Sequence, residues 1–340
     1  MAVTQSAPRR GAQWKFWARL GVSGVLLVVL VSKIHPENVL PKHSHLSTLA
    51  FFAFALLMAA FGIALSAWRW QRVLVVFDKH VPLRVLLSHY FAGQFVGNVL
   101  PSTIGGDVMR VSRGSKTVDS SEIAFASVAL ERLSGFVALP LLTFLGFLAR
   151  PSLIEQSWAW VALAIAGVTL VALAVILYAA GHPRLAGRFA EHENFMRFVG
   201  AVHLGIGRLR QEPRAAAGVL IAAMAYQLSV VLMVLLAVHT LAISLPIAAV
   251  FAFIPAVAMA QVLPLSLNGL GVREGLLVVF LAPLAGVSHG QAVGLGLLWY
   301  AMMLIVSLLG APSFAVGHRH RASSHAEEPV SPREPSTPAP

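Results

Sequence analysis

Long apolar runs separated by short polar segments make up most of the chain. A run of about 20 mostly apolar residues is long enough to cross the hydrocarbon core of a bilayer as a helix. Six runs meet this length, and they cover residues 16–34, 46–68, 122–149, 157–180, 214–238 and 291–316. The pattern therefore predicts an all-α fold, namely a polytopic helical membrane protein.

Two further apolar regions are interrupted by glycine, proline and polar residues. Residues 83–100 form one of them, and residues 241–267 followed by residues 275–287 form the other. Irregular backbone at membrane depth is tolerated only where it is packed in protein or lines a cavity. Both regions are therefore candidates for broken helices rather than simple spanning helices.

The distribution of positive charge orients the predicted helices. The leader at residues 1–15 is basic, and the long polar segment 181–214 carries six arginines, so both are predicted to be cytoplasmic. If residues 83–100 crossed the membrane fully, the two helices after them would place segment 181–214 outside. Residues 83–119 are therefore predicted to form a re-entrant hairpin, and both chain termini are predicted to be cytoplasmic.

Composition excludes several other classes of protein. Hydrophobic residues make up 57% of the 340-residue chain and charged residues only 11%, whereas soluble domains have about 25% charged residues. The chain has no cysteine, which excludes a disulfide scaffold, thiolate catalysis and cysteine-ligated metal centres. No metal site or cofactor is expected. The net charge of +11 follows from the positive-inside rule, so nucleic acid is not an expected partner.

The domain organisation follows from these patterns. After the leader, residues 16–316 are predicted to form one membrane domain, and residues 317–340 are rich in proline and predicted to be a disordered cytoplasmic tail. Segment 181–214 alternates arginines with apolar residues, which is typical of an amphipathic helix lying on a membrane surface.

An internal repeat links the two interrupted regions. Residues 98–110 align without gaps to residues 261–273, and both copies contain a proline, a glycine and an arginine at the same spacing. Proline removes a backbone donor and breaks a helix, and glycine allows close approach. The predicted structural breaks are Pro101, Gly105, Gly106, Pro264, Gly269 and Gly271.

The repeat predicts two inverted repeats with two re-entrant broken-helix hairpins, one entering from each side. In transporters of this kind the ligand binds between the two halves. Arg110 and Arg273 occupy equivalent positions, and a guanidinium suits phosphate through its bidentate geometry. The alternative is that both copies are tight loops whose arginines extend to the lipid headgroups.

Two charged residues lie inside an otherwise apolar predicted helix. Glu131 and Arg132 interrupt the run at residues 122–149, where a central charge costs about 2.5–3.5 kcal/mol even on the lower insertion scales. Glu131 is expected to pair with Arg110 or Arg273, and Arg132 with Asp107 or Glu274. The alternative is a static ion pair near the membrane interface.

These groups form a candidate binding site for an anionic or zwitterionic lipid headgroup. The candidate substrate-binding residues are Asn98, Asp107, Arg110, Glu131, Arg132, Asn268, Arg273 and Glu274. No nucleophile elbow, phosphate-binding loop, zinc motif or paired-carboxylate unit is present, so no catalytic residue is assigned.

Three motifs resemble one known family. They are Asn98-x-x-Pro101 with Gly105-Gly106-Asp107, then Glu131-Arg132-Leu133, then Asn268-Gly269-x-Gly271-Val272-Arg273-Glu274-Gly275. Together they resemble the lysylphosphatidylglycerol synthase transmembrane-domain (flippase-like) family over residues 15–316. The third motif is the most specific, although Asn268 stands where the family usually has glycine.

The resemblance implies a lipid-translocating membrane module. Some members carry an additional soluble domain that aminoacylates phosphatidylglycerol, whereas only the tail follows residue 316 here, so a stand-alone member without enzyme activity is expected. The leading hypothesis is a bacterial inner-membrane flippase or transporter for a phospholipid, an aminoacylated lipid, or a glycolipid or hopanoid-type lipid.

The alternative is a non-transporting membrane subunit that scaffolds a lipid- or glycan-synthesising enzyme. A membrane enzyme acting on headgroups is disfavoured by the missing catalytic set. A second copy of the chain or a lipid-biosynthesis enzyme is the expected kind of protein partner.

Overall fold

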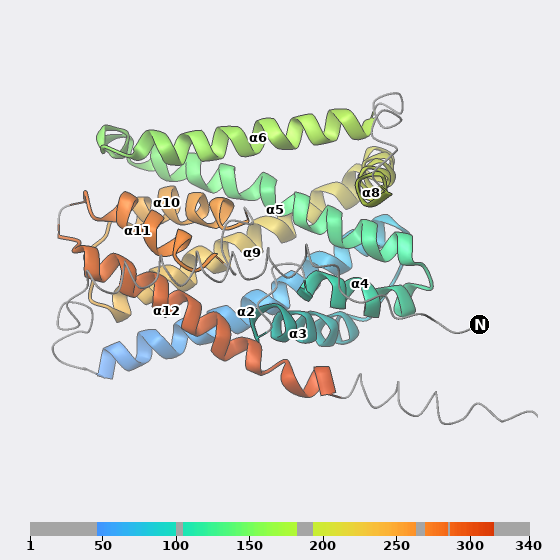
Figure 1. Ribbon diagram of the computed structural model, residues 1–340, viewed down its shortest axis with the longest axis horizontal. Coiled ribbons are helices and arrows are strands. Elements are labelled where there is room, and N and C mark those ends of the chain that lie inside the picture. Colours follow the sequence, from blue (N-terminus) through green and yellow to red (C-terminus); the bar gives the residue numbers. More distant parts are fainter. Residues whose placement is uncertain (1–45, 100–104, 182–192, 263–268, 285, 316–340) are drawn as a thin grey trace, which may run out of the picture.

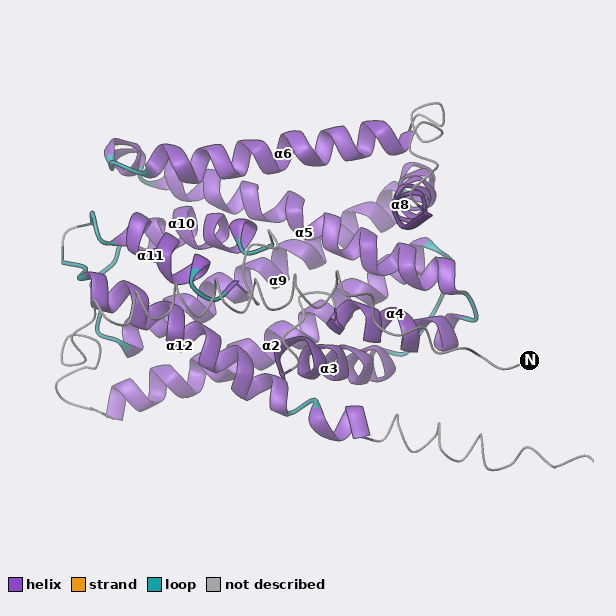
Figure 2. Cartoon of the chain, viewed as in Figure 1, coloured by secondary structure: helices purple, strands orange, loops and turns teal. Residues whose placement is uncertain are grey.

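Helices and short connections make up the described part of the protein. The computed structural model describes residues 46–99, 105–181, 193–262, 269–284 and 286–315 of the chain. Within these ranges no strand is present, as Figure 2 shows. The all-α fold predicted from the sequence is thereby confirmed.

Five helices are long and apolar enough to cross a membrane. They are α2 (Leu46–Val76), α5 (Ser121–Ala149), α6 (Ala159–Gly181), α9 (Pro213–Thr240) and α12 (His289–Leu308). Each corresponds to one of the six predicted spans, and the sixth, at residues 16–34, lies outside the described residues. The leader at residues 1–15 and the tail at residues 317–340 lie outside them as well.

Shorter helices fill the space between the long ones. They are α3 (Leu83–Val99), α4 (Gly105–Val118), α8 (Glu193–Gln211), α10 (Ile247–Ala260) and α11 (Val272–Leu281), with the 3₁₀ helix η2 (Pro151–Glu155) after α5. Helix α8, predicted as an amphipathic helix, is seen nearly end-on in Figure 1 and therefore lies across the direction of the long helices. Its position on a membrane surface stays a prediction.

Local sequence signals set several helix ends. The hydroxyl of Ser120 accepts a hydrogen bond from the backbone N–H of Ile123 at 3.1 Å and caps the start of α5. Ser288 and Gln291 cap the start of α12 by exchanging bonds between their side chains and backbone N–H groups. Helix α9 begins at Pro213, where a proline costs no helical hydrogen bond.

Two predicted helix ends are wrong. Helix α2 continues to Val76 rather than ending at residue 68, because Trp70 and Leu74 extend its buried face by another two turns. Helix α12 ends at Leu308 rather than at residue 316. The chain turns there, and Gly310 lies so close to the carbonyl of Phe91 that a side chain would not fit.

Helices α3 and α4 form an antiparallel hairpin. A side-chain hydrogen bond of 2.9 Å joins His89 to Thr117 near its open end. Closer to the tip, a Cβ added to Gly106 would lie 2.6 Å from the carbonyl oxygen of Gly93, so glycine is required for the two backbones to approach. The chain therefore reverses between residues 83 and 118, as a re-entrant hairpin requires, although its depth in a membrane stays a prediction.

The second interrupted region also contains two short helices. Helices α10 and α11 contact each other, and α10 includes Pro255 without ending there. In Figure 1, α3 and α4 lie toward the end of the bundle where α5 begins, whereas α10 and α11 lie toward the end where α5 finishes. This placement is compatible with the predicted inverted repeats, which the described residues do not establish.

Helix α5 occupies the centre of the bundle and positions the polar residues described below. It contacts α2, α4, α6, α8, α9 and α10. The contact with α10 is especially close, because a Cβ on Gly146 would lie 2.3 Å from the backbone nitrogen of Ala252. Small residues that allow helix backbones to approach are typical of membrane helix interfaces.

Candidate functional site

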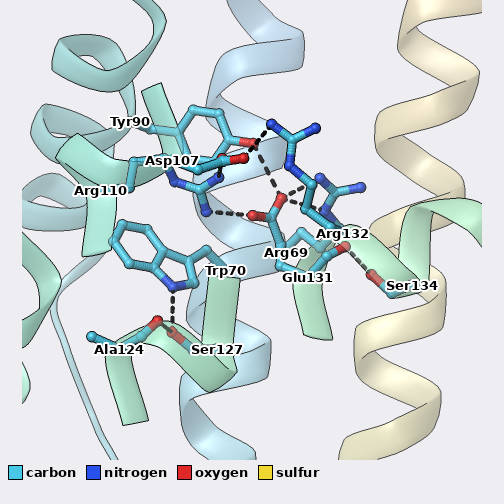
Figure 3. Close-up of polar contacts among 10 residues, drawn as sticks. All are labelled: Arg69, Trp70, Tyr90, Asp107, Arg110, Ala124, Ser127, Glu131, Arg132 and Ser134. Atoms are coloured by element: carbon cyan, nitrogen blue, oxygen red, sulfur yellow. Dashed lines mark hydrogen bonds and ion pairs between the residues drawn. The ribbon is translucent and has the colours of Figure 1, made fainter. Parts of the chain in front are cut away.

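A buried carboxylate is held by side chains from three other helices (Figure 3). Glu131 of α5 is fully buried, and its Oε1 accepts a hydrogen bond of 2.9 Å from Nε of Arg69 of α2. Arg110 of α4 donates from Nη2 to the other carboxylate oxygen, and the hydroxyl of Tyr90 of α3 donates to Oε1 at 3.1 Å. These four residues are called the buried ion cluster below.

Aromatic rings hold the two guanidinium groups of the cluster in place. The guanidinium carbon of Arg110 lies 4.1 Å from the ring centre of Tyr90 and 4.6 Å from that of Trp70. The guanidinium carbon of Arg69 lies 4.7 Å from the ring centre of Tyr226. Such cation–π contacts become stronger when the cation is removed from water, as here. The orientation of both arginines is therefore fixed by packing as well as by charge.

The cluster extends toward the surface through a second acidic residue. Arg110 contacts Asp107 at 3.4 Å, and Asp107 contacts Nη2 of Arg132 at 2.5 Å. The side chain of Asp107 is 22% exposed and that of Arg132 is 48% exposed. Charges thus alternate from Arg69 through Glu131, Arg110 and Asp107 to a half-exposed arginine, with three positive groups against two negative ones.

A second buried ion pair lies in the other half of the chain. Arg273 donates to Oε1 of Glu274 from Nε at 3.0 Å and from Nη2 at 2.6 Å. The other carboxylate oxygen accepts from the backbone N–H of Gly271 at 2.6 Å, where φ is +83° and glycine is favoured. Arg273 also lies over the rings of Trp299 and Tyr300 of α12, at 5.8 and 5.3 Å.

The structure brings together four of the candidate residues predicted from the sequence. Of the two partners expected for Glu131, it selects Arg110, and of the two expected for Arg132, it selects Asp107. Arg273 and Glu274 pair with each other instead of with α5. In the described ranges no ion pair joins the buried ion cluster to the Arg273–Glu274 pair, so the single constellation expected from the sequence consists of two separate groups.

The remaining predicted positions differ in what can be said of them. Asn98 lies half-buried at the end of α3, and Gly105 is the first residue of α4. Gly269 has a φ of +76° and contacts Gln261 so closely that a side chain would clash. Pro101, Pro264 and Asn268 lie outside the described residues. Arg110 and Arg273 are only 4% and 3% exposed, so the alternative that they extend to the headgroups is wrong.

Arg69 is a member of the cluster that sequence reasoning missed. The second predicted span ends at residue 68 and leaves Arg69 outside it, whereas Arg69 lies in α2 and is 5% exposed. The signal that could have found it is the continued helical spacing of apolar residues at Trp70, Val73 and Leu74. Tyr90, which was not among the predicted site residues either, also belongs to the cluster.

The fold and the site together define a helical membrane protein with charged groups buried between its helices, an arrangement that in membrane proteins usually marks a functional pathway. The lysylphosphatidylglycerol synthase TM region family matches residues 16–310, and the chain belongs to this family. No curated protein matches the chain in a sequence search.

Proposed function

We propose that this protein is a lipid flippase or lipid-handling transporter of the bacterial inner membrane. It carries lipids with anionic or zwitterionic headgroups, of the phospholipid, aminoacylated, glycolipid or hopanoid type, and does not change them chemically. Membership of a family of lysylphosphatidylglycerol synthase membrane regions supports a role connected with membrane lipids.

The observation that carries the proposal is the surplus of positive charge around Glu131. Three arginines face two carboxylates, and the outermost arginine, Arg132, is half-exposed. A guanidinium binds phosphate with two parallel hydrogen bonds. Arg132 is therefore the group that a headgroup reaches first, while Arg69 and Arg110 behind it retain the positive potential.

The contact between Asp107 and Arg132 connects headgroup binding to the α3/α4 hairpin. Asp107 lies on α4 and Arg132 on α5, so their ion pair links the hairpin to the central helix. A phosphate that replaces Asp107 at Arg132 releases this link, while Arg110 and Glu131 still hold α4 on α5. A ligand that binds one arrangement of the hairpin better than another shifts the protein toward it.

Reconstitution of the full chain into vesicles tests the proposal. Vesicles containing fluorescent phosphatidylglycerol are treated with a membrane-impermeant quencher, and the fraction of label moving between leaflets is followed in time. We expect Arg132→Ala to slow translocation about fivefold, the effect of losing one hydrogen bond worth about 1 kcal/mol.

Arg208 provides a matched control for this variant. It is also half-exposed, and it also contacts a single carboxylate, that of Asp78 at 2.6 Å. Arg208→Ala is expected to translocate lipid at the wild-type rate. Equal rates for Arg132→Ala and the wild type contradict the assigned site. Vesicles in which the wild-type protein moves no lipid contradict transport itself and favour the scaffold function.

A further inference from the structure

An apolar groove lies between α5, α6, α8 and α9. It has a volume of about 290 Å³ and is lined by residues of α5, α6, α8 and α9, among them Leu133, Val137, Leu173 and Leu220. This volume is close to the lower end of the range for small-molecule sites, about 300–1,000 Å³. The name α8 groove is used for it below.

Helix α8 closes one side of the groove. It crosses the bundle near one end (Figure 1), and Ile206 and Leu209 on its inner face line the groove. Gly205 brings α8 close to α5, since a Cβ there would lie 3.1 Å from the side chain of Leu130. The groove is thus bounded by four helices, and Leu133 and Leu173 within it are each only 7% exposed.

One cation lies among the apolar residues that line the groove. Arg210, in the last turn of α8, is exposed and forms no ion pair with any residue in the described part of the chain. Arg208, two residues earlier on α8, is already paired with Asp78. A ligand that fits this combination has an apolar chain to occupy the groove and a negative group to reach Arg210.

We propose that the α8 groove binds one acyl chain of an anionic phospholipid whose phosphate contacts Arg210. The inference rests on the proposed function in taking a membrane lipid as the ligand class. The apolar lining excludes a purely polar ligand, because burial without hydrogen-bond partners is costly for polar groups. The free cation selects an anionic headgroup over a neutral one.

Photocrosslinking of the full-length protein tests the site. The protein, purified in detergent, is irradiated with phosphatidylglycerol that carries a diazirine near the end of one acyl chain, and the modified peptides are mapped by mass spectrometry. We expect adducts on α5 and α6 at groove residues such as Val137 and Leu173. Unlabelled phosphatidylglycerol competes with them better than phosphatidylcholine does, and inorganic phosphate does not compete.

Variants at the mouth of the groove separate recognition of the headgroup from simple contact with lipid. Arg210→Ala changes an exposed side chain and is expected to reduce groove adducts about fivefold, whereas Arg210→Lys restores most of them. Arg214, which is exposed near the start of α9 and does not line the groove, is the control. Arg214→Ala is expected to change adduct formation less than twofold.

Equal labelling by a photoreactive phosphatidylcholine overturns the inference, and so does unchanged labelling in Arg210→Ala. Displacement by inorganic phosphate would also overturn it, by showing an anion site without a lipid chain. Translocation, measured after the same purified proteins are reconstituted into vesicles, distinguishes failure of the groove proposal from failure of the proposed function. Normal translocation without selective groove labelling refutes the groove alone, and selective labelling without translocation refutes transport alone.

Discussion

Glu131 places its negative charge directly between Arg69 and Arg110, so its removal leaves two buried cations without their shared partner. We expect Glu131→Gln to lower the free energy of unfolding by about 3–5 kcal/mol, the usual cost of breaking a buried pair from one side. Thermal unfolding of the purified variant in detergent measures this loss.

Glu122 provides the control, because it lies on the same helix but is exposed in the first turn. Glu122→Gln is expected to change stability by less than about 0.5 kcal/mol. Equal melting temperatures for Glu131→Gln and the wild type would show that the two arginines do not depend on this carboxylate.

The second ion pair gives a prediction that separates charge from geometry. Arg273→Ala leaves the buried carboxylate of Glu274 with only the backbone N–H of Gly271 as a described partner, so we expect a loss of about 3–5 kcal/mol. Arg273→Lys keeps the charge but loses the planar group over Trp299 and Tyr300, so its loss should be smaller. Melting curves in detergent measure the stability of both variants. A lysine variant as unstable as the alanine variant would contradict the expected order of stability.

At the scale of residues, the sequence predicts which charges need partners better than it predicts the partners. Arg110 could be named in advance as one of two alternative partners of Glu131, because Glu131 lies in a strongly apolar run and Arg110 in a repeated motif. Arg69 could not, because an arginine after an apolar run fits a cytoplasmic loop equally well. Arg273 was offered as one of two partners for Glu131, yet it pairs with its own neighbour, Glu274.

The close contact between α5 and α10 predicts a strong effect from a single methyl group. Gly146→Ala would place Cβ 2.3 Å from the backbone of Ala252, and backbone cannot move aside as a flexible side chain can. We expect a loss of about 1–3 kcal/mol, as is usual for an overfilled core. The measurement is again the melting temperature in detergent.

Gly167 of α6 is the matched control. It also lies in a long apolar helix, but no atom lies within 4 Å of the position that a Cβ would occupy. Gly167→Ala is expected to leave stability unchanged or to raise it slightly, since alanine favours the helix. The same loss in both variants would mean that helix propensity, and not the contact with α10, governs the result.

The segment after α12 predicts a difference between two truncations. Arg113 donates hydrogen bonds to the backbone carbonyls of Ser313 and Phe314, and the ring of Phe314 lies 5.6 Å from that of Phe95. Deletion of residues 317–340 should therefore leave melting and translocation unchanged. Deletion from residue 309 should lower the melting temperature, because it removes these contacts with the α3/α4 hairpin.

Helix boundaries show how far local signals determine elements. The starts of α5 and α12 agree with the sequence within two residues, because Ser120 and Ser288 cap them. The end of α12 was placed eight residues too late because residues 309–316 are as apolar as a spanning helix. Local stop signals are nevertheless present, because Gly310 directly follows the C-cap residue Leu309 and Pro312 comes two residues later. Gly310 also leaves room for the carbonyl of Phe91.

At the scale of the whole molecule, the absence of cysteine makes the predicted topology directly testable. Single cysteines are introduced at Ser115 near the end of α4, at Ser157 before α6 and at Ser244 before α10. We expect a membrane-impermeant maleimide to label the first only from the cytoplasmic side and the other two only from outside. Labelling of the cysteine at position 115 from outside would contradict the re-entrant assignment of the α3/α4 hairpin.

The overall architecture could be predicted from the sequence because the bilayer dictates it. Apolar runs of the required length become helices whatever their neighbours are, and five of them are present among the described residues. The arrangement of the helices around α5 could not be predicted, because it depends on contacts such as that of Gly146 with Ala252, which no pattern within one helix reveals.

The position of the buried ion cluster along the chain also has a consequence for biogenesis. Arg69, Tyr90, Arg110 and Glu131 all belong to the first 131 residues, so the ribosome has made every member of the cluster before it starts α6. At about 5–20 residues per second, the rest of the chain takes at least about 10 s to synthesise. The buried charges of Arg69, Arg110 and Glu131 can therefore pair with one another while the second half of the chain is still being translated. The contacts of Arg113 with residues 313 and 314, by contrast, must wait for the end of synthesis.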